Sequence, residues 1–305
     1  FLCYLVSIVF KVYKKKIDSA LITKVLESHE SFKNSSLSVF RAQGTDAFER
    51  PILDNLNNQV NSIQNPHLLG YSRDFRKSLE RIIFSSQISN CLSDFTGSDE
   101  HVQYQSMFFD RSTATKLHQD TWYLDTLPKG NLVGVWIALE DISKDCGPFC
   151  VYDAQIKNPL NSDQYDFHDL ENDLTFKHDY PKGKRYDFLA KKGDILIWNS
   201  FAIHGALQPI SPTLTRKSIT AHYYPSKFAV QDAPVKRFYS IYNHKNPKRS
   251  INKKLYKSAT INPYLYSTIS HLFHIMNPLK SIIMRDKELE TTQGDLLEIR
   301  RLNNK

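Results

Sequence analysis

The sequence is poor in the features that would assign it to several common protein classes. It contains only 4 cysteines among 305 residues, Cys3, Cys91, Cys146 and Cys150. Their number and spacing do not suit a disulfide scaffold, which favours a reducing compartment. No second cysteine pair accompanies Cys146 and Cys150, so free thiols are expected there instead of a zinc site. The 10 glycines and 13 prolines do not indicate low complexity. What is present, 41% hydrophobic residues, is enough to bury one full core.

The apolar run at the start of the sequence, residues 1–10, is too short to cross a bilayer, which takes about 20 apolar residues. Lys11 and Lys14 follow this run instead of preceding it, so the pattern does not fit a cleaved signal peptide. We expect a first helix here that packs against the core. A truncated membrane anchor is the alternative.

Acidic residues are missing from a second segment, between Ala233 and Arg285, where ten lysines and arginines occur. The whole chain has a net charge of +8, so the ten positive charges of this segment exceed the net charge of the protein. Such a segment suits an anionic substrate or an acidic membrane surface, and a solvated basic face is the alternative. The nearby aromatics Phe238 and Tyr239 form no known nucleic-acid module, so nucleic acid is not an expected partner.

One combination of residues predicts a metal site. His118 and Asp120 are two positions apart, so in an extended strand their side chains project from one face towards a single ion. His204 comes 84 residues after Asp120, just after the strand-like segment 193–199. Two histidines and one carboxylate are the ligand set of an iron(II) site that keeps three positions open. A structural role is the alternative for each residue alone, but the combination favours the metal site.

Arg216, 12 residues after His204, predicts what fills the open positions. A 2-oxoacid can chelate two of them and dioxygen can take the third. The second carboxylate of 2-oxoglutarate would need a fixed cation, and a guanidinium stays charged when buried and binds carboxylate through two parallel hydrogen bonds. The chain between His204 and Arg216 crosses the turn 208–212 and is expected to return on a strand beside the metal strand.

Alternation along two predicted strands supports an enclosed site. From residue 216 to residue 224 one face is polar, which fits a barrel interior that holds a charged cosubstrate. That face carries Arg216, Ser218, Thr220, His222 and Tyr224. In the segment 131–141, Gly134 and Trp136 share a face with small residues beside the indole, while the other face is apolar. This pattern indicates one face that lines a cavity, and a strand buried on both faces is the alternative.

The residues around this combination resemble the phytanoyl-CoA dioxygenase family of iron(II)/2-oxoglutarate oxygenases. The resemblance covers residues 100–225, and the segments that carry it, in order, are YQSMFF (104–109), LHQDTW (117–122), GVWIALED (134–141), CGPFCV (146–151), GDILIW (193–198), IHGA (203–206), RKS (216–218) and HY (222–223). It implies that His118, Asp120 and His204 are the iron ligands and form the catalytic centre. It also implies that Arg216 anchors the distal carboxylate of 2-oxoglutarate, and that Trp136 and Gln105 contact this cosubstrate.

Two positions depart from the family pattern. Where relatives continue with Pro-Gly-Ser-His, residues 153–156 read Asp-Ala-Gln-Ile, which leaves the substrate open. Ala206 stands where relatives often have Ser, so Ser218 is the candidate for the missing hydrogen bond to the cosubstrate. Halogenating relatives replace the metal carboxylate with a small residue. Because Asp120 is present, hydroxylation is the expected reaction.

The predicted fold class is mainly β with flanking helices, built on a double-stranded β-helix, the jelly-roll or cupin-like barrel. We expect one oxygenase domain, residues 1–305. Its parts are a mostly helical region 1–99, from apolar spacing in 17–27 and 75–91, a jelly-roll core 100–225, and a basic C-terminal extension 226–305. An acid-rich insert, residues 157–185, interrupts the core and is expected either to overhang the site or to form a solvated loop.

These observations predict an Fe(II)/2-oxoglutarate-dependent dioxygenase that hydroxylates a small organic substrate, anionic if the basic extension meets it. Its partners would be this substrate, 2-oxoglutarate and O2. One alternative is a cupin-like metal enzyme that does not use 2-oxoglutarate, against which Arg216 and Trp136 argue. Another is a non-catalytic, membrane-associated barrel protein, against which the intact metal set argues. A cytoplasmic location is expected, with peripheral membrane contact left open.

Overall fold

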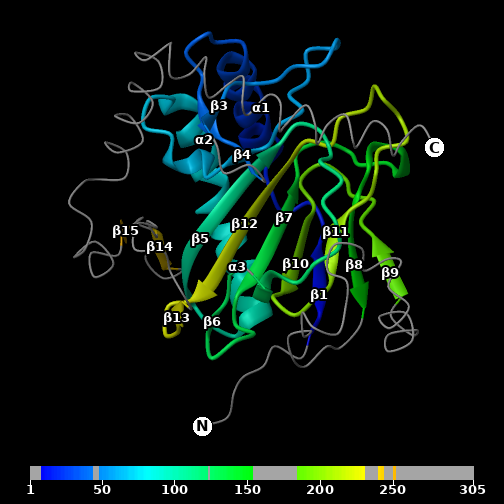
Figure 1. Ribbon diagram of the computed structural model, residues 1–305. Coiled ribbons are helices and arrows are strands. Elements are labelled where there is room, and N and C mark those ends of the chain that lie inside the picture. Colours follow the sequence, from blue (N-terminus) through cyan, green and yellow to red (C-terminus); the bar gives the residue numbers. More distant parts are fainter. Residues whose placement is uncertain are drawn as a thin grey trace.

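The larger of two facing antiparallel sheets contains most of the strands (Figure 1). The computed structural model describes residues 8–43, 48–122, 124–153, 184–230, 240–243 and 250–251. The sheet runs β1 (Phe10–Tyr13), β10 (Ile195–Asn199), β7 (Val133–Ala138), β12 (Ser218–Pro225), β5 (Glu100–Phe109), β14 (Ser240–Asn243) and β15 (Ser250–Ile251), with β4 (Ile63–Gln64) also paired to β5. Strands from both ends of the described chain therefore join the predicted core.

A smaller sheet packs against the inner face of the larger one. Its order is β11 (His204–Ala206), β8 (Phe149–Asp153) and β9 (Lys184–Asp187). Trp136 and Trp198 of the larger sheet meet Phe149 and Val151 of the smaller sheet in one buried apolar cluster. Two antiparallel sheets packed in this way form the predicted jelly roll. Among the described residues, hydrogen bonds do not close the two sheets into one continuous barrel.

Three helices cover the outer face of the larger sheet: α1 (Ser19–Lys33), α2 (Arg73–Ile83) and α3 (Ser86–Thr96). Asp18 caps α1 by accepting a hydrogen bond from the backbone N–H of Ala20 at 2.8 Å. Apolar residues of all three helices share a buried cluster with Val135, Ile197 and Ile219 of the sheet. Strand β7 is therefore buried on both faces, the alternative that its sequence left open. None of the helices in the described part of the chain is long and apolar enough to cross a membrane.

The helical prediction for residues 1–99 is correct for these three segments and wrong for the described parts of 34–72. That stretch forms β2 (Phe40–Arg41), β3 (Phe48–Glu49), β4 and a 3-10 turn, Pro66–Leu68. Asn57 and Asn65 adopt positive φ angles of 63° and 50°, a turn conformation that interrupts helices. The helix predicted over 75–91 is also broken, because Ser85 accepts a hydrogen bond from Ile88 N at 3.2 Å and begins α3 as a separate helix.

The first helix expected within residues 1–10 is wrong for the described residues 8–10, because Phe10 begins the edge strand β1. Phe10 pairs with Trp198 and Tyr13 with Ile195 in antiparallel register. Phe10 and Val12 pack on the cluster between the two sheets, whereas Tyr13 joins the cluster under the helices. This alternation suits a strand that is covered on both faces. Residues 1–7 lie outside the described part of the chain.

Two short antiparallel pairs complete the described strands. Strand β13 (Ala229–Val230) pairs with β6 (Thr126–Leu127), and β2 pairs with β3. The strand β14, which belongs to the segment predicted as a C-terminal extension, pairs with residues 100–103 of β5. Part of the predicted extension therefore adds a strand beside β5 in the larger sheet.

Candidate metal centre

Backbone pairing brings His118 and His204 together although they are 86 residues apart. Each backbone N–H donates to the other residue's carbonyl, at 2.9 and 3.0 Å, in an isolated antiparallel bridge. The chain then turns into a 3-10 helix, Asp120–Trp122, so that Asp120 points back at both rings. Ligand atoms of His118, Asp120 and His204 all lie within 4.8 Å of one another. The predicted trio is assembled, but the bridge and turn replace the extended strand expected for residues 118–120.

Backbone hydrogen bonds orient both imidazoles. Nδ1 of His118 lies 2.8 Å from the carbonyl oxygen of Lys116, and Nδ1 of His204 lies 3.0 Å from that of Ala202. An imidazole that donates from Nδ1 keeps the lone pair of Nε2 for a metal. The two Nε2 atoms are 3.9 and 3.5 Å from Oδ1 of Asp120. The donor set is thus arranged around one oxygen of the carboxylate.

The ionisation of this group suits a cation. Burial, together with the neighbouring ring of His204, lowers the pKa of His118 to about 4, so its imidazole is neutral at neutral pH. Burial alone would raise the pKa of Asp120, but the imidazoles of His204 and His222 outweigh it and hold that pKa well below its usual range. A neutral imidazole beside an ionised carboxylate has the protonation that binding of a divalent metal requires.

The second carboxylate oxygen of Asp120 is held by Trp198, the last residue of the GDILIW segment. Its indole Nε1 donates to Oδ2 of Asp120 at 2.9 Å. The same ring contacts His204, with ring centroids 4.8 Å apart. Trp198 pairs with Gly134 across β10 and β7, and a Cβ atom at Gly134 would overlap its six-membered ring. Glycine at this position therefore makes room for the indole that orients Asp120.

Arg216 lies just before β12 and is buried, with 2% of its surface exposed. Its guanidinium carbon lies 5.2 Å from the ring centroid of Phe109 and 5.7 Å from that of Trp136. Its Nε has no hydrogen-bond partner, and no described residue forms an ion pair with the guanidinium. Burial lowers the pKa of Arg216 to about 10, so the group is charged at neutral pH. A buried, charged and unpaired guanidinium requires an anion.

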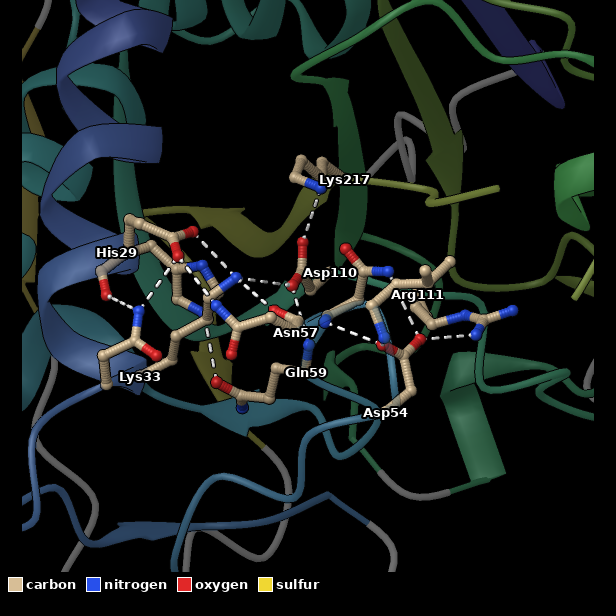
Figure 2. Close-up of polar contacts among 12 residues, drawn as sticks. His29, Lys33, Asp54, Asn57, Gln59, Asp110, Arg111 and Lys217 are labelled. Atoms are coloured by element: carbon tan, nitrogen blue, oxygen red, sulfur yellow. Dashed lines mark hydrogen bonds and ion pairs between the residues drawn. The ribbon is translucent and has the colours of Figure 1, made fainter. Parts of the chain in front are cut away.

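The strand after Arg216 does not run beside the metal segment as predicted; it lies between β5 and β7 in the larger sheet. Its start is held by a buried network around Asp110 (Figure 2). The Asp110 carbonyl accepts from Arg216 N at 3.0 Å, and its carboxylate lies 2.9 Å from Nζ of Lys217 and 3.9 Å from Nζ of Lys33. Gln59 N donates to the same carboxylate at 2.8 Å. Helix α1 is thereby tied to the point where Arg216 enters the site.

The other predicted cosubstrate contacts face the same interior. The indole Nε1 of Trp136 and the hydroxyl of Ser218 are buried and have no hydrogen-bond partner in the described chain. Trp136 pairs with Thr220 across β7 and β12, and Gln105 pairs with His222 across β5 and β12. Trp136 in β7 and Gln105 in β5 therefore lie on the two strands that flank β12, which begins at Ser218 shortly after Arg216.

The sequence pattern assigned no role to Trp198 and placed His222 only on the polar inner face, whereas in the structure both contact the carboxylate of Asp120. Nε2 of His222 lies 3.4 Å from Oδ1 of Asp120. Alternation along each strand was the available signal, because Trp198 shares a face with Leu196, and His222 shares a face with Arg216. Cys91, Cys146 and Cys150 are buried thiols. The predictions for residues 157–183 of the insert, for most of the extension 226–305 and for Cys3 fall outside the described residues, while Lys184 and Arg185, the last two residues of the predicted insert, begin strand β9.

Two facing antiparallel sheets with a two-histidine, one-carboxylate group define a jelly-roll protein with a facial metal-binding set. The family model described as phytanoyl-CoA dioxygenase (PhyH) matches residues 22–218, and the chain belongs to this family. No protein of curated function matches the sequence significantly.

Several solved structures share the fold. The non-heme alpha ketoglutarate dependent carbocyclase SnoK from nogalamycin biosynthesis has a TM-score of 0.53 at 13% identity, covering 75% of this chain and 85% of its own. The epimerase SnoN in complex with Fe3+, alpha ketoglutarate and nogalamycin RO has a TM-score of 0.52 at 14% identity, covering 73% and 81%. EctD from S. alaskensis with bound Fe has a TM-score of 0.51 at 15% identity, covering 72% and 73%. Identities at this level show a shared fold and no more.

Proposed function

We propose that this protein is an iron(II)- and 2-oxoglutarate-dependent oxygenase that hydroxylates a small organic substrate. His118, Asp120 and His204 would hold the iron through Nε2, Oδ1 and Nε2. When bound, iron and 2-oxoglutarate supply the oxidation of a C–H bond by dioxygen, with succinate and carbon dioxide as coproducts. Membership of the PhyH family, and the iron and alpha ketoglutarate named for the structures of similar fold, support this proposal.

The observation that carries the cosubstrate assignment is the state of Arg216. A charged group that is 2% exposed and has no ion-pair partner in the described chain would be strongly destabilising unless a ligand neutralised it. The distal carboxylate of 2-oxoglutarate supplies one negative charge and accepts two parallel hydrogen bonds from a guanidinium. Ser218 and Trp136 offer two further unpaired donors to the same ligand. A cupin-like metal enzyme that does not use 2-oxoglutarate would leave these groups without a partner.

The proposal is tested by loading the protein anaerobically with iron(II), adding 2-oxoglutarate and recording the visible charge-transfer band that a chelated 2-oxoacid gives. An oxygen pulse with candidate substrates, followed by measurement of succinate and of the product mass, then tests hydroxylation. We expect the band with the wild-type protein and its loss in His118→Ala and His204→Ala. Full iron occupancy in either variant would contradict the ligand assignment.

The arginine is tested separately. Arg216→Ala removes the proposed anchor and should weaken 2-oxoglutarate binding by about 2–3 kcal/mol, the range for a charge-assisted hydrogen-bonded pair. Arg216→Lys should recover only part of this loss, because an ammonium group cannot form the two parallel bonds. Arg185→Ala is the matched control, since Arg185 pairs with Asp187 at 2.7 Å in β9. An unchanged affinity in Arg216→Ala would favour an enzyme that does not use 2-oxoglutarate.

A further inference from the structure

A third imidazole lies beside the two histidines and the carboxylate of the metal group. His222 in β12 is 3% exposed, and its Nε2 lies 3.4 Å from Oδ1 of Asp120, the oxygen that also faces His204. The indole of Trp198 meets the His222 ring edge-on, with centroids 6.0 Å apart. Beyond this contact of Nε2 with Asp120, neither ring nitrogen of His222 has a well-aligned hydrogen bond in the part of the chain that the structure describes. The ring is thus packed in place, and its Nδ1 has no polar partner among the described residues.

An imidazole in this condition is expected to meet a ligand. A neutral imidazole always presents one N–H donor and one acceptor nitrogen. Leaving such an atom buried and unpaired is costly, so native proteins rarely do so without a bound partner. His222 does not belong to the metal set itself: only His118, Asp120 and His204 form a described group whose ligand atoms all lie within 4.8 Å of one another. The missing partner is therefore a molecule beside the metal.

The position of Arg216 identifies which molecule fits. Its guanidinium lies over Phe109 and Trp136, and these residues pair with Ser218 and Thr220 of β12. The guanidinium of Arg216 therefore lies near Ser218 and Thr220 on the polar face of β12. His222 lies two to four residues further along the same face, which is roughly 7–13 Å at the rise of a strand. A five-carbon dicarboxylate with a hydrogen bond at each end fills a span of this length.

We propose that His222 donates a hydrogen bond to the 2-oxoacid end of 2-oxoglutarate, while Arg216 binds the distal carboxylate. This inference rests on the proposed function. One face of β12 would then hold both ends of the cosubstrate, and His222 would orient the 2-oxoacid group against the metal. His222 is a positioning residue in this arrangement and supplies no metal ligand.

The test uses the full chain with His222→Phe, which keeps a ring of similar shape and removes both nitrogens. Iron(II) affinity is measured anaerobically, and 2-oxoglutarate affinity is measured from the visible charge-transfer band. A second probe is 2-oxovalerate, which keeps the 2-oxoacid group and replaces the distal carboxylate with a methyl group. We expect iron affinity within about twofold of the wild type, affinities for both 2-oxoacids about tenfold lower, and a shifted band. His222→Gln, which restores an N–H donor, should recover part of the loss.

Tyr223→Phe is the matched control, because Tyr223 is adjacent in β12 but faces the helices, where its hydroxyl donates to Ile83 O at 2.6 Å. It should change neither affinity. Loss of iron binding in His222→Phe would overturn the proposal, because His222 would then act on the metal-binding group instead of on the 2-oxoacid. The proposal would also be overturned if His222→Phe weakened the binding of 2-oxoglutarate but not of 2-oxovalerate, or if it left the binding of both 2-oxoacids unchanged. A wild-type protein that gives no band with iron and 2-oxoglutarate would instead refute the proposed function.

Discussion

The indole N–H of Trp198 donates to Oδ2 of Asp120 across 2.9 Å, and Oδ1 is left to face the imidazoles of His204 and His222. A carboxylate with one oxygen held in this way is directed to bind a metal through the other oxygen alone. Coordination through one oxygen would keep three metal positions free for ligands other than protein. By holding Oδ2, Trp198 of β10 would therefore keep three positions open at the proposed iron site.

Replacement of Trp198 by phenylalanine should weaken the metal site while keeping an aromatic ring in the core. The variant lacks the N–H that holds Oδ2, and loss of a hydrogen bond to a metal ligand typically lowers metal affinity about 10- to 100-fold. Iron(II) affinity, measured anaerobically by titration, should fall within that range. The control is Tyr13→Phe, which removes a buried hydroxyl bonded to Asp94 far along the chain from the metal ligands. Equal iron affinity in Trp198→Phe and the wild type would show that the contact does not orient Asp120.

A methyl group at Gly134 should displace Trp198. In Gly134→Ala the new Cβ overlaps the six-membered ring of the indole, and overpacking of this kind costs about 1–3 kcal/mol. Both the free energy of unfolding and the iron affinity should decrease. The double variant with Trp198→Phe should lose less than the sum of the two single variants, because the smaller ring leaves room for the methyl group. Additive losses in urea unfolding would mean that the two positions do not interact.

The residues whose side chains point into the site could be read from strand alternation. The polar face from Arg216 to His222 and the separation of Trp136 from the helix-facing Val135 follow from the two-residue period, although β7 is buried on both faces. The metal trio was predictable because residue type and order along the chain carry it. The geometry of the trio was not predictable, because the bridge and the 3-10 turn at Asp120 depend on contacts between His118 and His204, which are 86 residues apart in the sequence.

The N-terminal region shows why local patterns mislead. An apolar segment such as residues 8–13 suits a buried helix and a covered strand equally well, and only the free edge of β10 decides between them. The break between α2 and α3 depends on a single serine cap that a periodicity count does not weigh. Likewise, Asp110 looks like a residue at the end of a strand, and its role as a buried partner of two lysines arises from the packing of α1 against β5 and β12.

Neutralisation of Asp110 should be strongly destabilising. Its side chain is fully buried, and Asp110→Asn would leave Lys33, which is 4% exposed, and Lys217 without the charge that lies between them. Removing one member of a buried ion pair typically costs about 3–5 kcal/mol. Because Lys217 is adjacent to Arg216 and would lose its ion pair with Asp110, 2-oxoglutarate affinity should fall as well. Chemical unfolding gives the first quantity and the charge-transfer titration gives the second.

The neighbouring pair of Asp54 and Arg111 provides the control for Asp110 (Figure 2). These side chains are 2.7 Å apart and 13% and 14% exposed. Asp54→Asn should cost less stability and should leave 2-oxoglutarate affinity unchanged. Equal effects of Asp54→Asn and Asp110→Asn on cosubstrate binding would mean that the network does not act through Arg216.

Helix α1 contains a buried histidine that links stability to pH. His29 is packed against Phe108, with ring centroids 4.3 Å apart, and its Nε2 lies 3.0 Å from Oε1 of Gln59. Burial lowers the pKa of His29 to about 4, below its ordinary value of 6.5. Between these two values the unfolded chain binds a proton that the folded protein excludes. The stability contributed by the neutral ring is therefore complete above about pH 6.5 and is lost as the pH falls towards 4.

His29→Phe should remove this dependence. The variant should be less stable than the wild type at pH 7, because Gln59 loses its partner and the ring contacts change. Between pH 6 and pH 4.5 the difference should shrink by about 1.4 kcal/mol per pH unit, since only the wild type still loses stability through this group. Urea unfolding of both proteins across that range measures this difference in the free energy of unfolding. Burial also lowers the pKa of His101 to about 4, but His101 is present in both proteins and its contribution cancels in the difference. A difference that stays constant with pH would show that His29 is protonated equally in the folded and unfolded states, and the buried environment assigned to it would then be wrong.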